Sequence, residues 1–182
     1  MKGQFFLVGA FLLIVMFYIG ISVYITPSFA KPSLKESTEN LFDNIKNEYP
    51  RALNLGLSGS HVQAMEDFTN FAANLTRKMN ADLRVLWVIT ENVSDNLNVT
   101  VGNFFGSDHY VTINVSGEVK VMHVPDSGIN STLFTSTPAE FRLGLNFNTT
   151  QKNVLLEKYK VNLYSILEMA KGTDRITGEI KA

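Results

Sequence analysis

Residues 83–90, Leu-Arg-Val-Leu-Trp-Val-Ile-Thr, are the stretch that decides the fold. Apolar side chains occupy both faces that a strand would present here, around Trp87, the only tryptophan of the chain. A strand that is apolar on both faces is typical of the middle of a sheet that is covered on each side. The apolar period also changes here, from about 3.6 residues to about 2. We therefore expect helices before residue 83 and strands after it.

Two amphipathic helices are predicted upstream of this strand. Residues 33–36 and 60–63 each have the spacing of a capping box, in which the side chains of the first and fourth residues bond to each other's backbone amides. Apolar residues at helical spacing continue the first helix to about Tyr49, and Pro50 is expected to break or restart it. The second helix is expected over about 61–79, with its apolar stripe packed against the sheet.

Strand patterns downstream predict an antiparallel sheet or sandwich of about seven to eight strands. In the hairpin that follows residue 115, a three-residue loop at Ser116–Glu118 pairs Val115 with Val119 and keeps the apolar residues on one face. Helices followed by strands predict the α+β class. The other predicted strands lie at 97–101, 111–115, 140–147, 161–169 and 175–180, the last two joined at 171–173.

The amino terminus carries an uncharged apolar run from Phe5 to Ile25. A helix of this length reaches about 31 Å at about 1.5 Å per residue, which spans the hydrocarbon core of a bilayer. We interpret the run as a retained single-pass anchor. Cleavage after Ala30, which follows a small-x-small pattern, would instead give a secreted protein.

This interpretation predicts the domain layout of the chain. Residues 1–26 form the transmembrane anchor with a short leader, and the prolines of 27–33 mark a linker. A helical segment at 34–82 and a β-rich head at 83–182 together make one extracytoplasmic domain, 34–182. Its length is that of an ordinary single domain.

N-glycosylation acceptors of the type Asn-x-Ser/Thr are more than twice as frequent as the composition predicts by chance. An Asn- and Thr-rich β-protein also produces such motifs by composition alone, but an occupied acceptor requires an exposed position in an exported domain. Together with the apolar run, the acceptors predict a cytoplasmic amino terminus and an extracellular bulk. They are Asn74, Asn92, Asn98, Asn114, Asn130 and Asn148, and strand alternation turns Asn98 and Asn114 outward.

No pattern for catalysis or for a metal is found. A formal net charge of −1 gives no basic surface for nucleic acid, and the absence of cysteine excludes disulfides and thiol chemistry. His61, His109 and His123 lack ligand spacing, and the pairings Asp108–His109 and His123–Asp126 are too isolated to indicate a metal site. We therefore expect a protein that is not an enzyme and has no cofactor, no metal and no catalytic residues.

Phe104 and Phe105 stand side by side between Gly102 and Gly106. If both rings were exposed, they would form a contact tip for a partner or a glycan. The alternative interpretation places one ring in the core and the other over the rim of the sheet.

Lys2-Gly3-Gln4, followed at once by the apolar run, resembles the amino termini of archaeal type IV pilin-like proteins with a class III leader. The resemblance implies that a leader peptidase cuts between Gly3 and Gln4 on the cytoplasmic side. It also implies self-assembly through the amino-terminal helix, with a β-rich head outside. The chain departs from the family at Val8, where many pilins carry Glu, and at the prolines of the linker.

These patterns lead to an expected function. The chain is predicted to be a non-enzymatic, single-pass, N-glycosylated cell-surface protein in contact with the lipid bilayer, and a pilin-like structural subunit is its most specific form. The alternative is a membrane-tethered binding or recognition domain that does not assemble into filaments.

Overall fold

The computed structural model describes residues 34–56, 59–135, 137–147 and 150–182. Residues 37–182 form one compact unit. The predicted anchor, the linker and the leader residues Gly3 and Gln4 lie outside the described residues. In chain order the elements are α2 (Leu34–Leu55), α3 (His61–Lys78), β1 (Asp82–Val93), β2 (Asn96–Phe104), β3 (His109–Val115), β4 (Glu118–Val124), β5 (Gly128–Phe134), β6 (Glu140–Phe147), β7 (Thr150–Glu157), β8 (Asn162–Lys171) and β9 (Asp174–Lys181).

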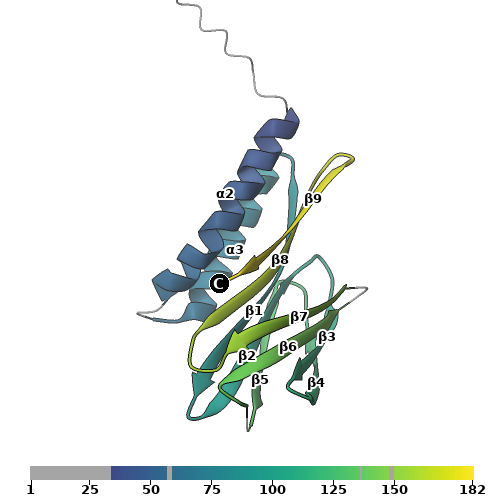
Figure 1. Ribbon diagram of the computed structural model, residues 1–182. Coiled ribbons are helices and arrows are strands. Elements are labelled where there is room, and N and C mark those ends of the chain that lie inside the picture. The colour runs from purple at the N-terminus through teal and green to yellow at the C-terminus, as the bar shows by residue number, and fades with distance from the viewer. Residues whose placement is uncertain (1–33, 57–58, 136, 148–149) are drawn as a thin grey trace, which may run out of the picture. The chain divides into compact units, whose positions relative to one another are not determined.

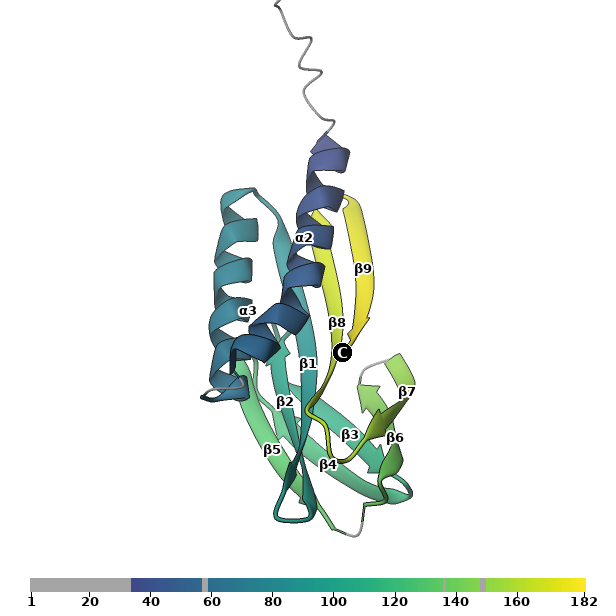
Figure 2. The same cartoon turned by 60° about the vertical axis from the view of Figure 1, so that its left-hand side comes forward.

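The strands form two antiparallel sheets. The first has the order β5-β2-β1-β8-β9 and the second the order β4-β3-β6-β7. Helices α2 and α3 lie side by side on one face of the five-stranded sheet, and the four-stranded sheet packs against its other face (Figures 1 and 2). Two hydrophobic cores result, one between helices and sheet and one between the two sheets.

The predicted α+β class with an amino-terminal transmembrane helix is wrong for the part of the chain that the structure describes. Those residues are mostly strand, with nine strands in two sheets and two helices. Among them, no helix has the length and apolar character needed to cross a membrane. The predicted count of seven to eight strands omits β5 and β7. Both lie at sheet edges and bury few side chains, so their sequences lack a strong apolar alternation.

The prediction for residues 83–90 is confirmed, because β1 is the central strand of the five-stranded sheet. Val85, Trp87 and Ile89 contribute to the core under the helices, and Leu86 and Val88 contribute to the core between the sheets. A strand in this position requires a cover on both faces, which the helix layer and the second sheet provide.

Helix α2 does not end at Pro50, contrary to prediction, and continues to Leu55. Proline removes one backbone donor and costs about 3 kcal/mol inside a helix. Ala52 and Leu53, which follow the proline, are buried in the core under the helices, so their packing offsets this loss. The buried Tyr49 hydroxyl donates to Thr69 Oγ1 of α3 at 3.2 Å. Helix α3 ends one residue before the predicted Met79.

The β3–β4 hairpin also differs from its predicted register. Its loop has two residues, Ser116 and Gly117, so that Val115 pairs with Glu118 and Asn114 pairs with Val119. Both loop residues have positive φ, +50° for Ser116 and +102° for Gly117. Two-residue turns of this kind have a backbone twist that matches the twist of the flanking strands. The preference of the turn therefore overrides the apolar alternation.

Gly102 is predicted to be essential for packing over the central strand. A Cβ atom at this position would lie 2.2 Å from Trp87 Cε2, and the Trp87 ring is fully buried. Gly102→Ala should therefore lower the free energy of unfolding by about 1–3 kcal/mol, measured by thermal or urea denaturation. Gly59→Ala is the control, since no atom lies within 4 Å of its Cβ. Equal stability of the two variants would contradict this packing.

Candidate functional site

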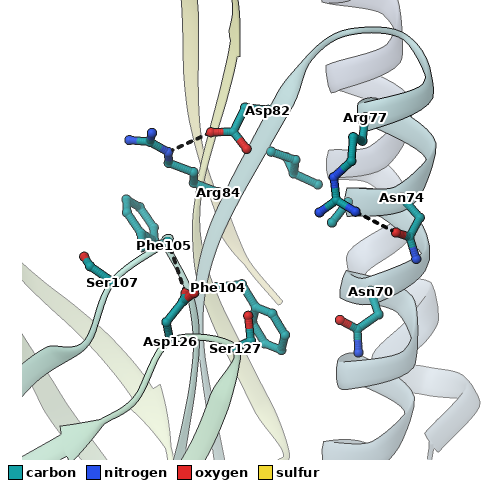
Figure 3. A pocket seen from close by; sticks show the side chains of 13 residues that line it. Asn70, Asn74, Arg77, Asp82, Arg84, Phe104, Phe105, Ser107, Asp126 and Ser127 are labelled. Atoms are coloured by element: carbon teal, nitrogen blue, oxygen red, sulfur yellow. Dashed lines mark hydrogen bonds and ion pairs between the residues drawn. The ribbon is translucent and has the colours of Figure 1, made fainter.

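A hollow of about 500 Å³ lies between α3, the start of β1 and two loops, 105–107 and 125–127. Figure 3 shows Asn70, Asn74 and Arg77 of α3 on one side of it and Phe105, Asp126 and their neighbours on the other. Its size is within the range of small-molecule pockets, but most of its lining is polar. The hollow therefore suits a polar ligand better than an apolar one.

The two arginines of the hollow differ in their partners. Arg84 Nε lies 3.0 Å from Asp82 Oδ2, and its Nη1 lies 3.7 Å from Glu168 Oε1. Arg77 Nη1 donates to Asn74 Oδ1 at 3.1 Å, and none of the ion pairs in the described part of the chain involves Arg77. Arg77 is therefore the cation that a carboxylate or sulfate group on a ligand would meet.

The two loops of the hollow are joined by a reciprocal set of hydrogen bonds. The Gly106 amide donates to Asp126 Oδ1 at 2.8 Å, and the Asp126 amide donates to Asp108 Oδ1 at 3.0 Å. His123 Nε2 lies 3.2 Å from Asp108 Oδ2. The bond from the Asp126 amide, followed by the contact with His123, holds the pKa of the Asp108 carboxyl below its usual value.

Asn103 anchors the same loops from below. Its fully buried side chain donates from Nδ2 to the carbonyls of Ser107 at 2.8 Å and Val124 at 3.0 Å, and its Oδ1 accepts from the Phe105 amide at 3.2 Å. Removal of such a buried polar partner leaves backbone groups unsatisfied. The rim of the hollow is therefore rigidly placed.

Phe104 and Phe105 point to opposite sides of their strand. Phe104 is 9% exposed and stacks on Trp87 with 6.4 Å between ring centroids. Phe105 is half-buried, and its ring lies edge-on to Phe147 at 5.6 Å and to His109 at 6.0 Å. The condition for a contact tip, exposure of both rings, is not met. Both phenylalanines line the hollow, and Phe105 is the more accessible of the two.

Ser107 and His109 are the side chains at this site that most resemble a catalytic serine–histidine pair. Ser107 Oγ lies 3.4 Å from His109 Nε2, longer than the hydrogen bond that activates a serine nucleophile. None of the hydrogen bonds found among the described residues joins a carboxylate to His109, so the third member of a triad is missing there. Within the same residues, no three His, Asp or Glu side chains are grouped as a metal site would require.

A second hollow of about 500 Å³ lies between β7 and β9, which are edge strands of the two different sheets. Its lining includes the apolar Phe105, Phe147 and Ile166. Lys152 of β7 and Glu179 of β9 bridge the opening, with 2.5 Å between Nζ and Oε1, and this contact is the main cause that holds the pKa of Glu179 below its usual value. This ion pair connects the open edges of the two sheets.

The sequence did not predict either hollow. Arg77 and Arg84 belong to a helix and a strand that follow each other, Asp126 lies far along the chain from both, and no local motif relates the three. Asn103 belongs to none of the predicted glycosylation acceptors, and its isolated position in a strand gave no signal of its anchoring role.

The five described acceptor asparagines all reach the surface, but their surroundings differ. Asn74, Asn92, Asn114 and Asn130 are exposed, and Asn98 is half-buried with its Nδ2 donating to Glu91 Oε1 at 3.0 Å. The hydroxyl residues of the first and third motifs, Thr76 and Thr100, are buried. Asn148 lies outside the described residues. Comparison with protein-family models and with curated proteins identifies no match to this chain.

Asp108 is predicted to hold the loop 125–127 in place. Asp108→Ala removes the acceptor of the Asp126 amide, so hydrogen exchange at that amide, followed by NMR, should become faster. Asp43→Ala, a change of an exposed carboxylate on α2, is the control and should leave it unchanged. Because the folded-state pKa of Asp108 is depressed, the protection is complete above the ordinary carboxyl pKa of about 3.9 and is lost as the pH falls through the lower folded value. Unchanged exchange in Asp108→Ala would refute this role.

Proposed function

We propose that this chain is a non-enzymatic, N-glycosylated cell-surface protein, anchored by residues 5–25 with its amino terminus in the cytoplasm and the unit 37–182 outside. The observation that carries the proposal is the distribution of the acceptors. All five in the described residues lie at the surface, whereas the two buried asparagines, Asn103 and Asn162, belong to none of the motifs. None of the described acceptors is buried, which is compatible with the accessibility that glycosylation requires.

The chemistry of the head agrees with a role in binding or architecture. Two of the larger polar side chains of the first hollow are engaged within the protein, since Arg84 is paired with Asp82 and Asp126 accepts from the Gly106 amide, whereas Arg77 stays available to a ligand. Side chains that hold structure in this way are poor candidates for the proton transfers of an enzyme. The extracellular surface offers a polar hollow and rigid hairpins, which suit recognition or subunit contact.

Occupancy of the acceptors is expected to follow their accessibility. Asn114, whose Ser116 is exposed in a tight turn, should carry glycan more completely than Asn98, whose amide nitrogen is engaged and whose Thr100 is buried. Glycopeptide mass spectrometry of protein from the native host measures this order. Asn153 is exposed but belongs to no acceptor motif, so the variant Asn153→Gln is the control and should leave the glycan mass unchanged. A chain with no added mass at any acceptor would falsify the glycoprotein proposal.

A filament subunit is the second candidate, favoured by one structural observation. Helix α2 is packed on the five-stranded sheet through Phe42, Ile45 and Tyr49. The chain thus enters the head through a helix that is fixed to its sheet. A unit whose first helix is packed in this way can keep its fold while it is tethered through the amino-terminal segment, as a filament subunit requires.

The filament candidate predicts two different effects in the amino-terminal segment. Gly3→Leu should block cutting of the leader, and Gly9→Leu should reduce assembly without changing thermal unfolding of the head, because apolar helices in lipid associate through close packing at small residues. Amino-terminal sequencing and sedimentation in mild detergent measure the two effects. A native chain that begins at Met1 and is monomeric in detergent would exclude the filament and leave a singly anchored glycoprotein.

A further inference from the structure

Two valine side chains are exposed to solvent on the outer face of the four-stranded sheet. Val119 is 56% exposed and Val121 is 62% exposed, both on the edge strand β4. They point outward because the two-residue turn sets the register, which places Val119 opposite Asn114 and Val121 opposite Thr112. Neighbouring exposed valines on a strand edge leave apolar surface that a cover would remove from water.

Asn114 lies within this surface and has the geometry of a modification site. Its Oδ1 accepts from the Gly117 amide at 2.8 Å, which fixes the side chain. The amide nitrogen, the atom to which an N-linked sugar is attached, takes part in none of the hydrogen bonds found among the described residues. The third residue of the motif, Ser116, is exposed in the turn.

A shallow groove of about 160 Å³ runs beside Asn114 across the same face. Its lining combines Val119 with the hydroxyl of Thr112 and the amides of Asn146 and Asn153. Gly144 keeps the groove open, since a Cβ there would lie 3.2 Å from Asn114 Cβ and 3.1 Å from Asn153 Oδ1. A sugar ring has an apolar C–H face and a rim of hydroxyls, and the groove offers partners for both.

We propose that an N-linked oligosaccharide on Asn114 folds over this groove and covers Val119 and Val121. The glycan is the chosen occupant because its attachment atom lies inside the apolar surface, directly across the strand pair from Val119. The inference rests on the glycoprotein proposal and adds a structural role for one acceptor. The sugar serves as part of the outer face of the sheet.

Asn92 provides a matched control within the same chain. It too stands two residues before a turn whose two loop residues, Ser94 and Asp95, have positive φ. It is exposed, but its cross-strand partner Leu97 is fully buried. A glycan at Asn92 therefore has no exposed valine opposite it to cover.

The test compares variants of the full chain, purified in detergent from the native host, on a hydrophobic-interaction column. Asn92→Gln and Asn114→Gln each remove one glycan, as intact mass records. Retention should rise more for Asn114→Gln, since that change also uncovers the valines. In a chain that also carries Val119→Thr and Val121→Thr, Asn92→Gln and Asn114→Gln should increase the column retention by equal amounts. Ser116→Gly, which suits the φ of +50° and keeps the Asn114 side chain, should repeat the effect of Asn114→Gln.

The outcomes separate this inference from the glycoprotein proposal. An unoccupied Asn114 beside an occupied Asn92 overturns the inference alone, and no glycan at any acceptor overturns both. The inference is also overturned if Asn92→Gln and Asn114→Gln raise the column retention equally in the native background. It is overturned as well if the larger rise for Asn114→Gln persists when Val119 and Val121 are replaced by threonine. A chain that is dimeric with its glycan present and becomes monomeric with the two threonines would assign the face to a second copy instead.

Discussion

The requirement that β1 be covered on both faces is the constraint on which the rest of the structure depends. Its side chains are apolar in both directions, so an open sheet would leave half of them in water. The helices cover Trp87 and its neighbours on one side, and the four-stranded sheet covers Leu86 and Val88 on the other. Gly102 completes the arrangement, since the missing Cβ leaves the space in which the indole ring lies.

The elements that the sequence predicted are those whose residues are buried in a regular pattern. The central strand, α3 and β6 at 140–147 follow from their own apolar periods, and so does the β8–β9 hairpin. Strands β5 and β7 were not predicted, because an edge strand buries few side chains and its sequence therefore resembles that of a loop. The course of α2 through Pro50 depended on packing partners that are distant in the chain, which no local pattern reports.

The β3–β4 hairpin shows how two local rules compete. The apolar alternation favoured a three-residue loop, whereas the positive φ of Ser116 and Gly117 belongs to a two-residue turn. The candidate site was beyond sequence reasoning for a related reason. Its charged groups come from α3, β1 and the loop 125–127, and Asn103 at the end of β2 holds that loop and the loop 105–107 in place. The acceptor asparagines could be found because glycosylation motifs are strictly local.

The attachment of α2 has a mechanical consequence. Backbone ladders join β1 to β2 and to β8, whereas α2 is held by the side-chain packing of Phe42, Ile45 and Tyr49 and by one hydroxyl contact, from Tyr49 to Thr69 of α3. Tension applied from the amino-terminal end therefore loads the helix–sheet contact before any strand pair. The helix would peel from the sheet at low force, while the two sheets behind it stay intact and act as the stiff part of the molecule.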